Sequence, residues 1–208
     1  MVNLQTYFEL SSRNHNHLCP RQILGVRIGL AGAKALDLDT TPTDKRLLVI
    51  VESDGCFADG VIAATGRMVG HRTLRIEDYG KIAATFVDTT KNRALRVAPQ
   101  VNVRERALTC VPDESRHYYA QLQAYQVLPE EELLTFTEVQ LKASLAQILS
   151  NPNARTRCAI CGEEIINERE IVREGCCLCR ACAGQAYYTP ASSIGTQSTF
   201  SMGELARG

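Results

Sequence analysis

The sequence predicts an α+β fold: an antiparallel sheet core packed with helices, followed by a small metal-stapled domain. Three observations lead to this prediction. Short strand candidates follow one another between residues 72 and 99, with helical patterns gathered before and after them. Hydrophobic residues make up 45% of the 208-residue chain, enough for a core of its own. Six of the nine cysteines lie in a 25-residue window near the C-terminus.

Charge and hydropathy exclude several classes of protein. Lys and Arg number 23 and Asp and Glu number 23, so the formal net charge is zero, which disfavours bulk electrostatic binding of nucleic acid. The purest apolar run, Leu47–Val51, is five residues long and too short to cross a bilayer. The first residues contain no cationic segment leading into an apolar run, which predicts no signal peptide and a cytoplasmic location. Metal ligands or reactive thiols are then favoured over disulfides.

The N-terminal part of the chain is predicted to be helical. Residues 6–10 could begin a short helix, and Pro20 suits the first turn of a longer one. In that longer helix Gly25, Gly29 and Ala33 fall on one face, where small residues cost stability unless another backbone comes close. We therefore expect tight packing against another helix, with a dimer axis as one place for it. The alternative is a small-residue face that is merely tolerated inside one subunit.

The middle of the chain is predicted to form the sheet. Residues 47–51 are an apolar, β-branched run typical of a buried strand, and a short helix is expected around residues 58–65. Strand candidates follow at residues 72–78, 81–88 and 93–99, separated by turn residues. This succession suits an antiparallel meander.

The segments that follow complete the predicted domains. Residues 100–110 are interpreted as one more strand, with Cys110 as an apolar strand residue. Amphipathic patterns at residues 115–128 and 137–149 indicate two helices. The Asn-Pro-Asn segment at residues 151–153 is typical of a linker. The predicted domains are a core at residues 1–150, a zinc-binding domain at residues 154–190 and a mobile tail at residues 191–208.

The strongest motif consists of two Cys-x-x-Cys pairs. Cys158 and Cys161 form the first pair, and after seventeen residues Cys179 and Cys182 form the second. Four thiolates at this spacing suit a tetrahedral structural Zn²⁺. Gly162 permits a tight knuckle after the first pair, a β-hairpin is expected between the pairs, and the second pair opens a short helix. This order of elements is typical of a treble-clef zinc finger.

Two further cysteines leave the ligand set open. Cys176 and Cys177 precede Cys179, and Cys176 with Cys179 forms a Cys-x-x-Cys pair of its own. We prefer Cys179 and Cys182 because ligands that open a helix are typical of the treble clef. A disulfide knot and an iron–sulfur cluster are the alternatives. Five Arg and five Glu between residues 154 and 185 favour a structural or protein-contact module over a nucleic-acid clamp.

A second motif lies near the N-terminus. In an extended segment His15, His17 and Cys19 point the same way, and imidazole with thiolate suits a metal ion. Cys56 precedes a predicted helix, where a thiol pKa is lowered. The four side chains could form one core site, with Cys56, His17 and Asp59 as candidate catalytic residues. The alternative interpretation has the histidines exposed in a loop and the cysteines inert in the core.

Several segments in order along the chain resemble the FmdE family, named for a component of formylmethanofuran dehydrogenase and for the operons that encode it. They are His15-x-His17-x-Cys19-Pro20, LGVRIGLAG, ESDGCFAD, ATGRMVGHRTL and DYGKIA, and the similarity covers about residues 10–150. The resemblance implies an α+β core, an intertwined homodimer, and a metal or catalytic-like site of His17, Cys19 and Cys56, with His15 and Asp59 close by. Some members also end in a Cys-rich zinc finger. The chain departs from the family at Asn16 and Arg21, where glycine is usual.

Three functions stay open, and the sequence does not decide whether the chain is an enzyme. The first is a metal-binding protein of molybdenum or tungsten enzyme metabolism. It would hold Zn²⁺ in the finger and a second divalent ion in the core, with one position left open. The second is a regulatory adaptor whose finger contacts a protein or, against the charge balance, nucleic acid. The third is a metal-dependent enzyme acting on a C1 or pterin-like substrate, which rests on the family name alone.

Overall fold

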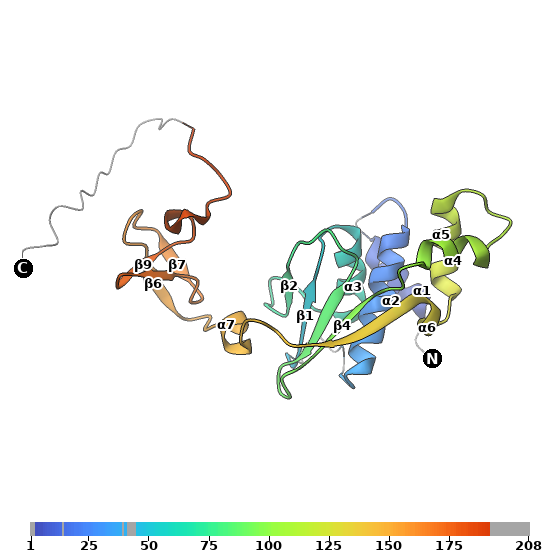
Figure 1. Ribbon diagram of the computed structural model, residues 1–208, viewed down its shortest axis with the longest axis horizontal. Helices are drawn as coiled ribbons and strands as arrows, with labels where there is room; N and C mark the ends of the chain where they lie inside the picture. Colours follow the sequence, from blue (N-terminus) through green and yellow to red (C-terminus); the bar gives the residue numbers. More distant parts are fainter. Residues whose placement is uncertain (1–2, 14, 39, 41–44, 192–208) are drawn as a thin grey trace, which may run out of the picture. The chain divides into compact units, whose positions relative to one another are not determined.

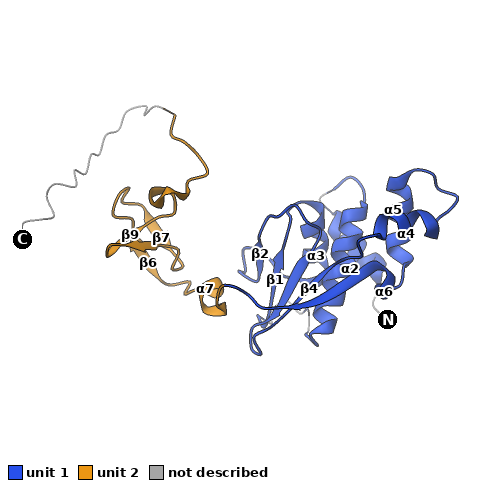
Figure 2. Ribbon diagram, viewed as in Figure 1, with its two compact units in different colours: residues 1–142 blue, residues 143–208 orange. Residues whose placement is uncertain are grey.

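The structure, a computed structural model, describes residues 3–13, 15–38, 40 and 45–191 (Figure 1). The chain divides into two compact units, residues 1–142 and residues 143–208 (Figure 2). Within the described ranges, no helix is both long and apolar enough to span a membrane. The predicted tail from residue 192 onward lies outside the described residues, and the predicted domain limits stay predictions.

Unit 1 is built on a five-stranded sheet with the order β2-β1-β3-β4-β5. Its strands are β1 (Leu47–Val51), β2 (Leu74–Ile76), β3 (Ala84–Asp88), β4 (Arg93–Pro99) and β5 (Leu134–Val139). The pairs β1–β3, β3–β4 and β4–β5 are antiparallel, whereas β2 runs parallel to β1. The α+β class is confirmed, but the simple meander is wrong at this edge. Helix α3 (Cys56–Thr65) lies between β1 and β2 in the chain, and such a crossover brings the next strand back parallel.

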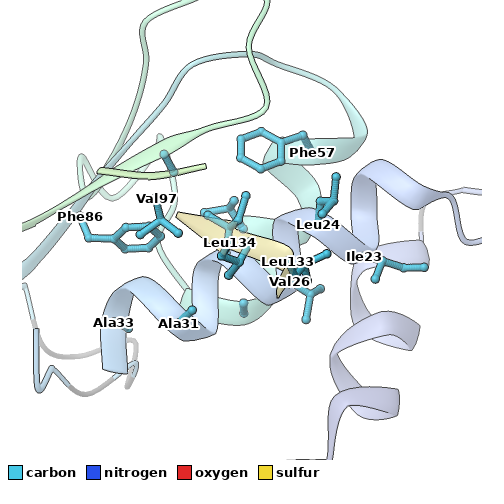
Figure 3. Close-up of a cluster of buried hydrophobic side chains, with 14 of the residues drawn as sticks. Ile23, Leu24, Val26, Ala31, Ala33, Phe57, Phe86, Val97, Leu133 and Leu134 are labelled. Carbon is cyan, nitrogen blue, oxygen red and sulfur yellow. The ribbon is translucent and has the colours of Figure 1, made fainter. Parts of the chain in front are cut away.

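The helices of unit 1 gather around α2 (Pro20–Ala35), which contacts β3, β4, α3 and α5 (Figure 1). The others are α1 (Leu4–Ser12), α4 (Val103–Cys110), α5 (His117–Val127) and α6 (Glu130–Leu133). Figure 3 shows Leu24 and Val26 of α2 in one apolar cluster with Phe57 of α3, Phe86 of β3 and Val97 of β4. This cluster fixes the start of α2 relative to the sheet, and the candidate site lies at that start.

The small-residue face of α2 packs against α3 of the same chain. A Cβ atom on Gly25 would overlap the backbone of Phe57 and Gly60, and one on Gly60 would overlap the backbone of α2. Gly29 faces Ala64 in the same way. The expected tight packing against another helix is therefore observed, and at Gly25 and Gly29 that helix is α3 of the same chain.

Two segments differ from their predicted structure. Residues 103–110 form helix α4, not a strand, and its two buried residues, Val103 and Ala107, lie about one helical turn apart. Cys110 is therefore the exposed last residue of a helix. The predicted helix at residues 137–149 begins instead as part of β5, because pairing with β4 overrides the local pattern. Only α7 (Leu145–Leu149) is helical there.

One buried ion pair anchors the end of β3. Arg46 donates to both carboxylate oxygens of Asp88, at 2.9 and 2.6 Å, and the Asp88 side chain is 1% exposed. The hydrogen bond from Arg46 is the main reason that the pKa of this carboxyl lies far below its ordinary value. Burial opposes the shift, and the backbone N–H groups of Thr90 and Lys91 add to it.

Unit 2 contains α7 and two small hairpins. The hairpins pair β6 (Arg155–Arg157) with β7 (Glu164–Ile166), and β8 (Ile171–Arg173) with β9 (Cys176–Leu178). The hairpin expected between the cysteine pairs is present as β8–β9, with Glu174 and Gly175 at positive φ in its turn. Strand β7 also lies between the two cysteine pairs, but it pairs with β6, which precedes the first pair. A single helical turn, η1 (Ala181–Gln185), follows.

Candidate metal centre and core cavity

Four cysteines meet in unit 2. One ligand atom from each of Cys158, Cys161, Cys179 and Cys182 lies within 4.8 Å of all the others. The first pair occupies the knuckle between β6 and β7, while Cys179 follows β9 and Cys182 lies in η1. The Sγ atoms of Cys161 and Cys179 are 3.9 Å apart. Two thiolates on one tetrahedral Zn²⁺, with Zn–S bonds of about 2.3 Å, are separated by about 3.8 Å. These residues therefore fit a tetrahedral metal ion.

The electrostatics of this cluster favour a cation. Burial raises the pKa of the Cys158 thiol, but backbone N–H groups of Cys161, Cys179 and Ile160 outweigh it and lower the pKa to about 6. Burial, together with the neighbouring thiols, raises the pKa of Cys182 to about 12. One thiol thus ionises easily while the last resists, because burial and hydrogen bonds with the neighbouring thiols favour its neutral form. A divalent ion bound to the four sulfurs would favour the thiolate form instead.

The two remaining cysteines of this unit lie outside the group. Both belong to β9, where Cys176 is exposed and the carbonyl of Cys177 accepts a hydrogen bond from Ala159 N at 2.8 Å. The structure therefore brings Cys179 and Cys182, the preferred pair, to Cys158 and Cys161.

A second candidate site is a cavity of 620 Å³ in unit 1, where α2 and α3 begin. Three predicted core residues, His17, Cys19 and Cys56, line it. The other walls come from α4, α5 and the ends of β-strands, and they are largely apolar or aromatic. This volume lies within the usual range for small-molecule sites, about 300–1,000 Å³.

Cys19 is fixed by a residue outside the predicted site. Gln22 is fully buried in the first turn of α2, and its side-chain oxygen accepts a hydrogen bond from Cys19 N at 2.8 Å. Its amide nitrogen donates to Ser11 O of α1, also at 2.8 Å. The spacing of an N-cap residue and a Gln three positions later is the sequence signal that points to this role.

The thiols of Cys19 and Cys56 interact across the cavity wall. Burial raises the pKa of Cys56, and a hydrogen bond with the Cys19 thiol raises it further. The charge of Arg21 and a backbone hydrogen bond act in the opposite direction. The predicted lowering of this pKa at a helix start is therefore wrong in its net direction, because burial and the second thiol outweigh the helix.

His15 and Asp59 form a pair of their own. Nε2 of His15 lies 2.8 Å from Oδ2 of Asp59, which connects the segment before α2 to the first turn of α3. Neither residue lines the cavity. Among the described residues, the only group of three or more ligands drawn within bonding range of one ion is the cysteine cluster of unit 2. The structure thus places His17, Cys19 and Cys56 in the lining of one cavity and pairs His15 with Asp59.

Arg27 joins the opposite walls of the cavity. Its guanidinium donates to the carbonyl oxygens of Tyr125, Gln126 and Leu128 at 3.0, 3.3 and 2.8 Å, where helix α5 ends. Burial lowers the pKa of Arg27, and Glu130 partly restores it. These bonds satisfy carbonyl groups that a helix end leaves open, and they hold α5 against α2.

Comparison with known proteins identifies the family to which this fold belongs. The family model described as "FmdE, Molybdenum formylmethanofuran dehydrogenase operon" matches residues 14–156. The chain belongs to the FmdE family.

This FmdE chain is also similar to a curated protein and to a solved structure. It is 32% identical over 196 residues to a "Probable S-adenosyl-L-methionine-binding protein" of Archaeoglobus fulgidus, covering 83% of this chain and 51% of that protein. The chain thus spans about half the length of that relative. The crystal structure of a tungsten formylmethanofuran dehydrogenase FmdE-like protein from Syntrophus aciditrophicus matches with a TM-score of 0.58. That match covers 90% of this chain and 96% of the other at 18% identity, so it establishes likeness of fold.

Proposed function

We propose that this FmdE chain is a metal-binding protein in which Cys158, Cys161, Cys179 and Cys182 hold a structural Zn²⁺ in a treble-clef finger. The observation that carries the proposal is the mutual approach of the four ligand atoms to within 4.8 Å. The order of knuckle, hairpin and short helix supports the treble-clef assignment. The small core of unit 2 supports a structural role for the ion, since it offers little other folding energy.

Metal analysis of the full chain tests this proposal. Cys161→Ser removes one ligand and is expected to lower bound zinc by one equivalent per chain. Cys176→Ser is the matched control, because that thiol lies in the same unit and outside the group. Undiminished zinc in Cys161→Ser would reject the ligand set. Bound iron with visible absorption in the parent chain would show that the four cysteines hold an iron–sulfur cluster and not zinc.

The cavity of unit 1 is proposed as the functional site, with a second soft divalent ion, Zn²⁺ or another, on Cys19, Cys56 and His17. Two interacting thiols and an imidazole line the same cavity and offer this donor set. The ion would have to draw them together, because among the described residues only the cysteines of unit 2 already lie within bonding range of one ion. Such an ion supplies Lewis acidity at an open position. Cys56 and His17 stand as the catalytic candidates at that position, and Asp59, the third candidate, is paired with His15 outside the cavity lining. The descriptions of the family and of the Syntrophus protein support an accessory role in molybdenum or tungsten enzyme metabolism.

The second ion is tested by counting metal in two variants. Cys56→Ala is expected to lower the total from two equivalents to one without changing the far-ultraviolet circular dichroism. Cys110→Ala, an exposed thiol at the end of α4, is the control and is expected to keep both equivalents. An unchanged number of metal equivalents in Cys56→Ala would contradict a metal ion in the core and would not bear on the proposed zinc site of unit 2.

A metal-dependent enzyme acting on a C1 or pterin-like substrate is the second candidate. A cavity of 620 Å³ offers far more room than an ion needs, which favours a small-molecule ligand beside the thiols.

The resemblance to the family supports a homodimer, and nine free cysteines suit the reducing cytoplasm. Sedimentation analysis of the full chain tests the dimer, and the finger remains a proposed surface for a protein partner.

A further inference from the structure

We infer that the cavity of unit 1 binds an anionic ring compound, a planar body that carries a phosphate or carboxylate group, through Arg21 and Arg104. The inference deepens the proposed function, since it rests on the same cavity being the functional site. It follows from the charge of the cavity wall and from the side chains of α5 that line the same cavity.

Two guanidinium groups line the cavity and have no acidic partner in the described part of the chain. Arg21 comes from the first turn of α2 and Arg104 from the first turn of α4. Neither forms an ion pair with a described carboxylate, whereas Arg46, Arg96 and Arg116 pair with acids elsewhere in unit 1.

The described lining of the cavity contains no carboxylate. Among the described residues, none that line it is an Asp or a Glu. Glu105, the neighbour of Arg104, lines a different cavity, and its charge reaches this one at Tyr125. In a chain whose formal net charge is zero, this wall concentrates positive charge at one place. Guanidinium groups bind phosphate and carboxylate oxygens by paired hydrogen bonds, so an anionic group is the complementary ligand.

The helix starts add to this field. Cys19 and Pro20 at the start of α2 and Cys56 at the start of α3 all border the cavity. The first-turn N–H groups of a helix carry partial positive charge and favour an anion nearby. The arginines and the helix starts therefore act in the same direction.

The α5 part of the lining suits a ring. Tyr118, Gln121 and Tyr125 recur on one face of α5, three and four residues apart, and all three line the cavity. The Tyr118 side chain is 42% exposed, so its ring is available to stack on a planar group, and the Gln121 amide offers both a donor and an acceptor to the edge of a heterocycle, whereas Tyr125 is 1% exposed and only fills the wall. Leu24 and Val103 complete an apolar floor. A free inorganic anion would leave this wall unused.

Calorimetric titration of the full chain with adenosine derivatives tests the inference. AMP presents a phosphate and adenosine 5′-carboxylate a carboxylate on the same ring body, whereas adenosine lacks both. We expect AMP or adenosine 5′-carboxylate to bind at least about tenfold more tightly than adenosine, a ratio that one charge-assisted contact supplies. Which of the two binds identifies the anionic group. Inorganic phosphate binding as tightly as AMP would overturn the requirement for a ring.

Arginine variants locate the contact. Arg21→Gln and Arg104→Gln are each expected to lower the affinity for the anionic ligand about tenfold and to leave adenosine binding unchanged. Arg173→Gln is the matched control, since Arg173 is an exposed arginine of unit 2, and it is expected to bind like the parent chain. Equal binding by all three variants overturns the inference, as does the absence of binding by both anionic compounds. Since the core ion is counted separately in Cys56→Ala, either idea can fail while the other stands.

Discussion

The two units of the chain use their cysteines in opposite ways. Unit 1 has a large, continuous apolar cluster that spans α2, α3 and the sheet (Figure 3), so its fold does not depend on Cys19 or Cys56. In unit 2 the buried cluster consists of Cys158, Ile165, Leu178 and Ala183, and one of the four proposed metal ligands is itself a member. In the first unit thiols are available for chemistry because apolar burial holds the fold. In the second, on the proposed function, the cysteines hold the fold through their metal ion, because the apolar core is small.

The largest expected effect comes from removing the metal of unit 2. Treating the full chain with a strong chelator should unfold residues 154–185 and leave unit 1 folded, because structural zinc contributes about 10–16 kcal/mol of apparent binding energy in small fingers. Hydrogen exchange followed by residue measures this directly. Amide protection should vanish in β6–β9 and persist in β1, β3 and β4.

Two controls sharpen that comparison. Restoring zinc should restore protection in unit 2, which separates metal loss from irreversible damage. If unit 2 kept its protection after complete removal of metal, the contrast between the two units would be mistaken. Loss of protection throughout unit 1 would instead show that its fold also depends on bound metal.

The next effect belongs to unit 1 and to its buried ion pair. Asp88→Asn removes the charge that Arg46 binds, and it should lower the free energy of unfolding of unit 1 at pH 7 by about 1.5–3 kcal/mol. The folded pKa of Asp88 lies below its unfolded value of about 3.9. Its contribution is therefore complete above that value and is lost as the pH falls toward the folded pKa.

Urea unfolding between pH 3 and pH 8 measures this dependence. The difference between the parent chain and Asp88→Asn should be constant above about pH 5 and should shrink below about pH 4. Arg93 and Glu138 supply the control, because both are exposed and Glu138→Gln should change stability by no more than about 1 kcal/mol. A difference for Asp88→Asn that grew on acidification would contradict the assigned sign.

The same contrast explains which features can be predicted from the sequence. The cysteine spacing predicts the set of thiols that meet in unit 2, because short-range spacing constrains a local metal site. The pair His15 and Asp59 cannot be predicted as a unit, since contact between residues 44 positions apart depends on the packing of α2 on α3. The local pattern alone therefore groups His15 with the metal ligands.

Errors in the secondary structure have a similar origin. Val103 and Ala107 are too few to distinguish a helical from a strand pattern in a short segment, and only the position of α4 against α5 selects the helix. Residues 137–139 belong to the segment 137–149 whose pattern predicts a helix, and they form a strand instead because they pair with β4. The cavity walls lie beyond prediction for the same reason, since they combine α2, α3, α4 and α5.

The smallest expected effect tests the close packing on which unit 1 depends. Gly25→Ala places a methyl group against the backbone of Phe57 and Gly60, which cannot move aside as a side chain could. Overpacking of this kind should lower the stability of unit 1 by about 1–3 kcal/mol. Gly70→Ala is the matched control, because a Cβ there meets nothing within 4 Å, and it should be neutral within about 0.5 kcal/mol. Both variants should keep the zinc of unit 2, since its ligands lie within one unit. Equal stability of the two variants would mean that α2 and α3 can separate at no cost, and the positions of Cys19 and Cys56 would then not be fixed by helix packing.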